Sequence, residues 1–153
     1  MRNTKHFEYK QSIEEQKFDS FAKYKNITRY NYTALECPFD VKMKSGSTYI
    51  IAETKVREDY DLEFFSKYGA YLEYKKIDGM VRERERIKKQ NGVDVELYYF
   101  NFTSNGLQVF ALKEPQDYQF EWKYLPKDNI DKNNKIYKLV ATLKEPTETL
   151  HYK

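Results

Sequence analysis

The chain has few residues of the types that build most structural metal centres and nucleophilic sites. Among its 153 residues there is one cysteine, Cys37, and there are two histidines, His6 and His151. A single cysteine excludes a disulfide within the chain and a cysteine zinc cluster. Two histidines near opposite ends of the sequence give little support to a histidine metal site or to a Ser-His triad.

Long hydrophobic runs are missing as well. No segment approaches the roughly 18 apolar residues that mark a transmembrane helix, and the first ten residues, MRNTKHFEYK, lack the apolar core of a signal peptide. We therefore expect no membrane partner and a cytoplasmic protein.

A large excess of one charge is also absent. Charged residues make up 33% of the chain, but its net charge is only +3, so nucleic-acid binding would need a local basic patch. What the chain has in quantity is aromatic residues, 15 tyrosines and 10 phenylalanines. These favour strands and predict a sheet that carries much of the core. The length predicts one domain over residues 1–153.

Residue spacing predicts an α/β (α+β) fold with a mixed central sheet. The first three strands should form an antiparallel meander, and residues 58–69 show no clean period. The second helix should end at Asn91-Gly92. The predicted helices cover residues 9–25 and 70–90, and the predicted strands cover residues 27–33, 39–43, 48–57, 93–103, 107–112, 118–125 and 135–143.

The third predicted strand, TYIIAETKVR, places charged residues where both faces should be covered. Side chains alternate along a strand, so Glu53 and Lys55 share one face. A buried Glu and Lys are costly unless they are paired or bind a metal. Twelve residues separate Glu53 from Asp40, which is enough for a hairpin that brings the two carboxylates together.

The spacing acid-x-Lys is not specific by itself. It occurs six times, beginning at Glu8, Glu15, Asp40, Glu53, Glu73 and Glu121. Glu53 differs from the other five acids in two ways. It follows the apolar start of a strand that comes after a glycine turn, and a Pro-x-Asp segment lies upstream of it.

The segments PFD (residues 38–40) and AETK (residues 52–55) resemble the signature of the PD-(D/E)XK nuclease superfamily, which includes restriction enzymes and Holliday-junction resolvases. The resemblance covers residues 9–103 and extends to small phage-type members through ETKVR, the long helix and ELYYFNF. It implies a restriction-endonuclease-like core of helix, three-strand meander, helix and further strand. Phe39, inserted between the proline and the acid, departs from the family pattern.

The resemblance implies a nuclease that cuts phosphodiester bonds, in DNA before RNA, with Mg²⁺ or Mn²⁺ as cofactor. Asp40 and Glu53 would bind the metal, and the backbone carbonyl of Thr54 would be a third ligand. Lys55 would orient the attacking water or offset charge on the phosphate. Oxygen ligands suit these cations independently of the resemblance.

Further residues complete the implied site. Many family members add a glutamate from the first helix, and either Glu14 or Glu15 could fill that role. Lys75 and Lys76 are placed to bind nucleic acid, and Arg57 could reach a phosphate or cap the strand end. Glu73 and Lys76 also match a helix-start acid and lysine of similar phage-type sequences. A homodimer is expected if two strands are cut.

Plainer interpretations stand beside these. Glu53 and Lys55 could be an ordinary ion pair, and the chain could be a non-catalytic module that binds nucleic acid or protein on the same fold. The charged residues 82–89 could contact phosphates or form a solvated helix face with local ion pairs, which we favour. Five aromatic residues could stack on bases, but we expect them in the core, as we do Trp122: Tyr71, Tyr74, Tyr98, Tyr99 and Phe100.

Overall fold

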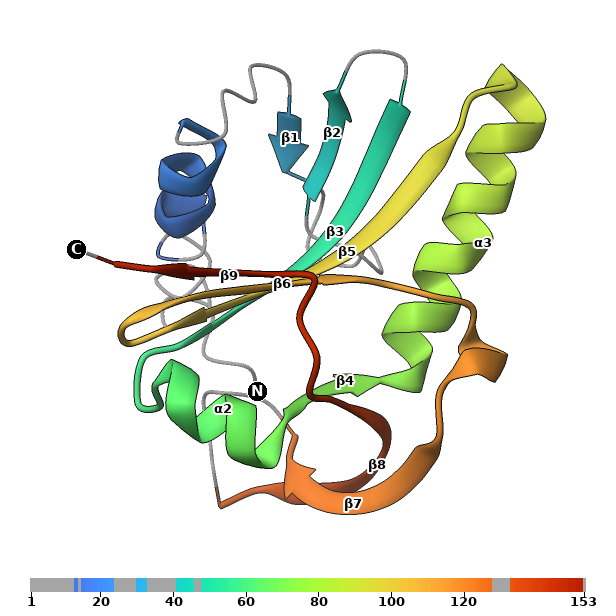
Figure 1. The fold of residues 1–153 in the computed structure, drawn as a ribbon. Coiled ribbons are helices and arrows are strands. Elements are labelled where there is room, and N and C mark those ends of the chain that lie inside the picture. Colours follow the sequence, from blue (N-terminus) through green and yellow to red (C-terminus); the bar gives the residue numbers. More distant parts are fainter. Residues whose placement is uncertain are drawn as a thin grey trace.

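The computed structural model describes residues 13, 15–23, 30–32, 41–45, 48–127 and 133–152. This part of the chain forms a mixed α/β structure with a six-stranded and a three-stranded sheet (Figure 1). The strands of the larger sheet, in spatial order, are β1 (Tyr30–Tyr32), β2 (Val41–Ser45), β3 (Thr48–Arg57), β5 (Val95–Thr103), β6 (Gly106–Ala111) and β9 (Glu148–His151).

The larger sheet begins as the predicted antiparallel meander, in which β2 lies between β1 and β3. The next neighbour, β5, runs parallel to β3 over its length, from Tyr49 beside Val95 to Arg57 beside Thr103. A parallel pair needs a long crossover connection, and the helix α3 (Tyr74–Asn91) lies within it. β6 and β9 then continue the sheet antiparallel. β3 therefore lies inside the sheet, with neighbours on both edges.

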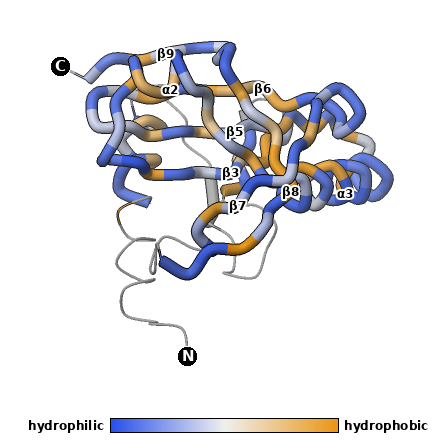
Figure 2. Tube along the Cα trace, turned by 90° about the horizontal axis from the view of Figure 1, so that it is seen from below, coloured by the Kyte–Doolittle hydropathy of each residue, from blue (hydrophilic) through white to orange (hydrophobic). Residues whose placement is uncertain are grey.

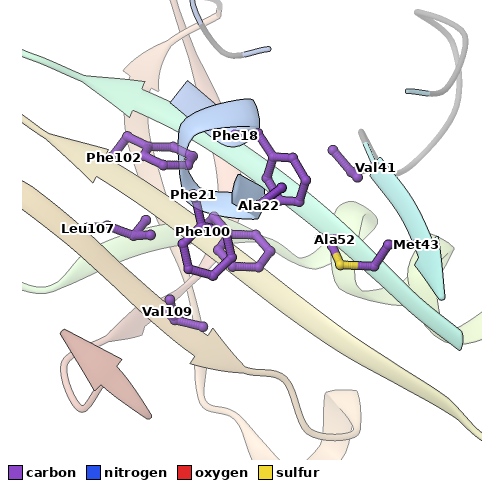
Figure 3. Close-up of a cluster of buried hydrophobic side chains, with 10 residues drawn as sticks. All are labelled: Phe18, Phe21, Ala22, Val41, Met43, Ala52, Phe100, Phe102, Leu107 and Val109. Carbon is purple, nitrogen blue, oxygen red and sulfur yellow. The ribbon is translucent and has the colours of Figure 1, made fainter. Parts of the chain in front are cut away.

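The first helix, residues 15–23, covers one face of the larger sheet. Figure 3 shows Phe18 and Phe21 pointing from this helix toward Phe100 of β5. The ring centroids of Phe18 and Phe21 lie 5.4 and 5.0 Å from that of Phe100. Ala52 of β3 belongs to the same buried cluster. Burial of such side chains contributes about 1.5–3 kcal/mol each, so this cluster holds the helix to the sheet.

The helix α3 covers the opposite face. Its buried residues Ile77, Met80 and Ile87 follow helical spacing. Met80 and Ile87 cluster with Ile51 of β3, whereas Ile77 clusters with Tyr99 of β5. Figure 2 shows the resulting alternation of hydrophobic and hydrophilic residues along α3. No helix in the described ranges is long and apolar enough to cross a membrane.

The smaller sheet packs against the face of the larger sheet that α3 also covers. It consists of β4 (Ala70–Glu73), β8 (Lys135–Leu143) and β7 (Phe120–Pro126), in that order. A buried cluster joins Leu72 of β4 to Phe65, Tyr99 and Phe110, which belong to α2 (Leu62–Tyr68), β5 and β6. In Figure 1 the strands β7 and β8 curve beneath the larger sheet.

The prediction of helix over residues 70–73 was wrong, because these residues form β4. Ala70 and Leu72 are buried, whereas Tyr71 and Glu73 are half-buried, which is the alternation of a strand. The helix α3 begins at Tyr74 and ends at Asn91. Its predicted end is confirmed, since Gly92 adopts the left-handed conformation that caps helices, with φ 65°.

Two further features differ from the sequence prediction. Residues 58–69, which received no element, contain α2, whose first turn is capped by the Asp61 carboxylate accepting from the Phe64 N–H at 2.8 Å. Trp122 was placed in the core but is 68% exposed. Of the other aromatic residues expected in the core, Tyr99 and Phe100 are buried, and Tyr71 and Tyr98 are half-buried. The prediction was wrong for Tyr74, which is 38% exposed.

Two further elements were not predicted, and two strands have the predicted bounds. The 3₁₀ helix Pro115–Asp117 and β9 were not predicted. The bounds of β3 and β8 are those that the sequence predicted.

Substitution of Gly106 by alanine should destabilise the fold more than the same change at Gly92. A Cβ at Gly106 would meet the carbonyl of Leu150 and the side chain of Leu62, whereas a Cβ at Gly92 would meet nothing within 4 Å. We expect G106A to lower the free energy of unfolding by about 1–3 kcal/mol. G92A should lower it by about 1 kcal/mol, which is the strain of a left-handed backbone at a residue with a Cβ. Urea denaturation of both variants tests this, and a loss at Gly106 no larger than at Gly92 would contradict the tight β6–β9 packing.

Candidate functional site

The position of Glu53 follows from the alternation of β3 between two covered faces. Ala52 faces the first helix, and Ile51 faces α3. Glu53 is therefore expected on the α3 face, and its contact with α3 agrees. The Glu53 residue is 1% exposed. A carboxylate so far from water needs a nearby positive charge, because the desolvation of an isolated charge is very costly.

Two lysine side chains supply that charge. The Nζ of Lys55, on the same face of β3, lies 3.6 Å from Oε1 of Glu53. The Nζ of Lys76, from the first turn of α3, lies 3.7 Å from the same oxygen. The lysine side chains are 32% and 27% exposed. The group of Glu53, Lys55 and Lys76, here called the Glu53 site, therefore has a buried acid and two cations that still reach water.

A second acid lies at the start of the same helix. Glu73 precedes α3 in an extended conformation, and its side chain is 20% exposed. Its carboxylate lies 3.2 Å from Nζ of Lys138 on β8 and 3.9 Å from Nζ of Lys75. The smaller sheet is thereby connected by an ion pair to the end of α3 that contributes Lys76. Sequence reasoning noted Glu73 but not Lys138, since these residues are far apart in the chain.

Polar side chains continue across the α3 face of the larger sheet. Lys55 lies beside Asn101 on β5, and Asn101 lies beside Gln108 on β6. The residues Asn101 and Gln108 are 0% and 1% exposed, and Asn101 Nδ2 donates to Gln108 Oε1 at 3.1 Å. Buried polar groups of this kind are costly unless they are hydrogen-bonded. They were missed from the sequence, although FNF and LQV each place a polar residue between two apolar ones.

The basic stretch of α3 is largely engaged in ion pairs. Arg82 contacts Asp78 at 3.0 Å, Arg84 contacts Glu114, and Arg86 contacts Glu83. The hydrogen bond from Arg86 lowers the pKa of Glu83 below its ordinary value. These contacts agree with the expected helix face carrying local ion pairs.

The other predicted residues lie around the Glu53 site or outside the described part. Thr54 is buried, and Lys75, 75% exposed, faces solvent beside Glu73. Arg57 ends β3 and is half-buried, and its buried Nε has no hydrogen bond to the described residues. Glu15 is half-buried on the first helix, which covers the face of β3 opposite to that of Glu53. Asp40 and Glu14 lie outside the described residues.

Comparisons of the chain with protein-family models, with curated proteins and with solved structures find no match. Within the described ranges, no group of three or more His, Cys, Asp or Glu side chains is arranged to hold a metal ion. Asp40, a predicted ligand, is not among the residues to which that statement applies.

Removal of Lys76 should destabilise the protein more than removal of its neighbour. Lys76→Gln leaves the buried carboxylate of Glu53 with one cation fewer, and we expect a loss of about 1–2 kcal/mol, less than for a fully buried pair because the lysine is partly solvated. Lys75→Gln removes only a solvent-exposed contact and should change stability by no more than about 0.5 kcal/mol. Chemical denaturation at neutral pH compares them, and equal effects would mean that Lys76 does not stabilise Glu53.

Proposed function

We propose that the chain is a divalent-metal-dependent nuclease that hydrolyses phosphodiester bonds, and we favour DNA over RNA as its substrate. The observation that carries the proposal is the buried Glu53 carboxylate with the Nζ atoms of Lys55 and Lys76 3.6 and 3.7 Å from its Oε1. One acid and two lysines have a net positive charge. That charge suits a site that must attract a phosphate while keeping a carboxylate for a cation.

The arrangement of the elements supports a restriction-endonuclease-like core. The resemblance implies a helix, a three-strand meander, a second helix and a further strand, with acid-x-Lys on the third strand. The first helix, the meander β1–β2–β3, the helix α3 and the parallel strand β5 follow one another in that order. α2 and β4 are inserted between β3 and α3. Glu53 lies on the third strand of the meander.

The donor chemistry of Glu53 fits Mg²⁺ or Mn²⁺. Magnesium is commonly held by one or two carboxylates, with water and substrate phosphate as the remaining ligands. Glu53 would hold the ion, together with Asp40 and the backbone carbonyl of Thr54. Asp40 precedes Val41 in the chain, and Val41 pairs with Ala52, the residue before Glu53. When bound, such a cation lowers the pKa of its water and offsets negative charge on the phosphate.

The lysines have separate roles in this proposal. Their side chains are long and partly exposed, so they can turn from Glu53 to a substrate phosphate once a cation balances the carboxylate. Lys55 orients the attacking water, and Lys76 binds phosphate from the first turn of α3, where the helix dipole also favours an anion. Lys75 and Arg57 contact flanking phosphates. Of the two glutamates considered on the first helix, Glu14 is retained to complete the site, because Glu15 belongs to the part of the helix that covers the face of β3 opposite to Glu53.

Cutting both strands of a duplex or a junction requires two such sites. A homodimer would supply them in a symmetric arrangement.

One observation favours a second candidate, a non-catalytic module that binds nucleic acid or protein. The two lysines already offset the buried charge of Glu53. A metal ion is therefore not needed to explain why the carboxylate is tolerated there. In that case the Glu53 site only stabilises the fold. Substituting its residues changes the free energy of unfolding, and there is no cleavage activity to lose.

The deciding experiment measures cleavage of supercoiled plasmid, linear duplex, single strand and four-way junction with Mg²⁺, Mn²⁺ or EDTA. The wild type should cut one or more of these substrates only with metal. The double variant Glu53→Gln/Lys55→Gln should lose about a hundredfold or more in rate, because it removes the carboxylate ligand and the lysine beside the reacting phosphate.

A matched control is the double variant Glu121→Gln/Lys123→Gln. It also removes an acid and a lysine two residues apart on a strand, where the two groups form an ion pair at 3.5 Å. Its rate should stay near that of the wild type. Absence of cutting by a folded wild type with every metal would favour the binding module. Metal-dependent cutting that falls equally in the two double variants would mean that the chemistry does not depend on Glu53 and Lys55.

A further inference from the structure

The smaller sheet carries an aromatic surface on its outer strands. Trp122, Tyr124 and Tyr137 are 68%, 57% and 69% exposed. Trp122 and Tyr124 are two residues apart on β7, and Tyr124 lies opposite Tyr137 of β8. The three side chains therefore share one face, and the ring centroids of Tyr124 and Tyr137 are 5.0 Å apart. They are here called the aromatic face.

Three exposed rings in a row need an explanation, because most phenylalanines of the described chain are in the core, although other tyrosines such as Tyr60 and Tyr68 are also exposed. Folding leaves these three rings accessible, although burying them would stabilise the protein. Rings held on a paired, two-stranded ribbon lose little further entropy when they bind a flat partner. A stack of bases is such a partner.

The described residues of the ribbon have a net positive charge, while the connection between its two strands, residues 128–132, contains Asp128, Asp131 and Lys132. In the described residues of the β7–β8 ribbon, 118–127 and 133–143, there are four lysines and one acid. Glu121 and Lys123 contact each other at 3.5 Å and lie on the opposite face of β7.

Lys135 shares the face of Tyr137, and Lys127 follows the last residue of β7. Both are exposed cations at the end of the ribbon. Lysines beside exposed rings fit a polyanion that has unpaired bases.

The aromatic face is also continuous with the Glu53 site. Phe120 is next on the same face of β7, and its ring centroid lies 5.1 Å from that of Tyr74. Tyr74 is the first residue of α3, the helix that contributes Lys76. Lys138 of β8 contacts Glu73 at the same helix end, from the opposite face of the ribbon. A strand lying along the ribbon would thus be led toward the Glu53 site.

We propose that the β7–β8 ribbon binds a single-stranded segment of nucleic acid by stacking bases on Trp122, Tyr124 and Tyr137, with Lys127 and Lys135 contacting phosphates. This rests on the proposed function in one respect, that the bound strand is the substrate of the Glu53 site. Stacking on rings tolerates any base, so recognition is of unpaired structure rather than of sequence.

The test uses Trp122 itself, the only tryptophan of the chain. Oligothymidine added in EDTA should quench its fluorescence, and the quenching midpoint should weaken with salt, because lysine–phosphate contacts release counterions. Unlabelled duplex should quench much less. Because EDTA prevents metal-dependent cutting, it separates binding from chemistry. Quenching in EDTA by a protein that cuts nothing when Mg²⁺ or Mn²⁺ is supplied would leave this inference standing and overturn only the proposed chemistry.

Substitutions in the aromatic face test whether it is the surface that binds the oligonucleotide. By fluorescence anisotropy of labelled oligothymidine, Trp122→Ala and Tyr124→Ala/Tyr137→Ala should each bind about tenfold more weakly, the loss of a stacked base. Tyr68→Ala is the matched control, a tyrosine 53% exposed on α2, and should bind like the wild type. Circular dichroism confirms that each variant is folded.

Three results would overturn the inference. The first is oligothymidine binding that leaves Trp122 fluorescence unchanged or is weakened equally by Tyr68→Ala. The second is a fluorescence change caused by lipid vesicles but not by oligothymidine. The third is a blue shift that depends on protein concentration alone, which would mean that a second copy of the chain covers the aromatic face.

Discussion

The structure around β3 depends on how the charge of one buried carboxylate is offset. Glu53 is 1% exposed on an internal strand, and its Oε1 has the ammonium groups of Lys55 and Lys76 within 4 Å. A carboxylate with no positive neighbour would not be tolerated there. The requirement fixes the start of α3 over the end of β3, because Lys76 must reach the strand. It also leaves two partly solvated cations beside a buried acid, which is the arrangement on which the proposed chemistry depends.

The two faces of the larger sheet differ in polarity. The face toward the first helix is a hydrophobic cluster of Phe18, Phe21, Phe100 and their neighbours, which contributes stability. The face toward α3 is apolar near Ile51 and becomes polar at Glu53. The smaller sheet borders this polar end through the contact of Lys138 with Glu73. Both faces therefore contribute stability, and the Glu53 site lies at the polar end of the α3 face, on the same side of the sheet as the β7–β8 ribbon.

The sequence predicted best the elements whose pattern is local. The bounds of β3 and β8 follow from apolar and aromatic alternation, and the end of α3 follows from Gly92. α2 could have been found from Asp61 and Gly69, which cap it. Residues 70–73 were assigned to the helix because their strand partner, β8, lies about 70 residues further along the chain. Trp122 was expected in the core because tryptophan side chains are highly buried on average. Its actual exposure depends on which part of β7 extends past the packed core, and no local pattern shows that.

The candidate site divides in the same way. Glu53 and Lys55 are two residues apart, so alternation alone places them together, and the resemblance gave them a role. Lys76 was named for its place at a helix start, but its contact with Glu53 depends on packing between α3 and β3. Lys138, Asn101 and Gln108 come from distant segments, and no local pattern joins them to Glu53.

Isothermal titration of Mn²⁺ into the nucleic-acid-free protein, beside the Glu53→Gln variant, tests the central claim most directly. This measurement does not depend on substrate choice. If Glu53 is a metal ligand, the wild type will bind Mn²⁺ and the folded variant, which keeps the size of the side chain but loses its charge, will bind it much more weakly. Binding that is equal in the two proteins, or absent from the wild type, would contradict a metal site at Glu53 and leave the two lysines as its only counter-charges among the described residues.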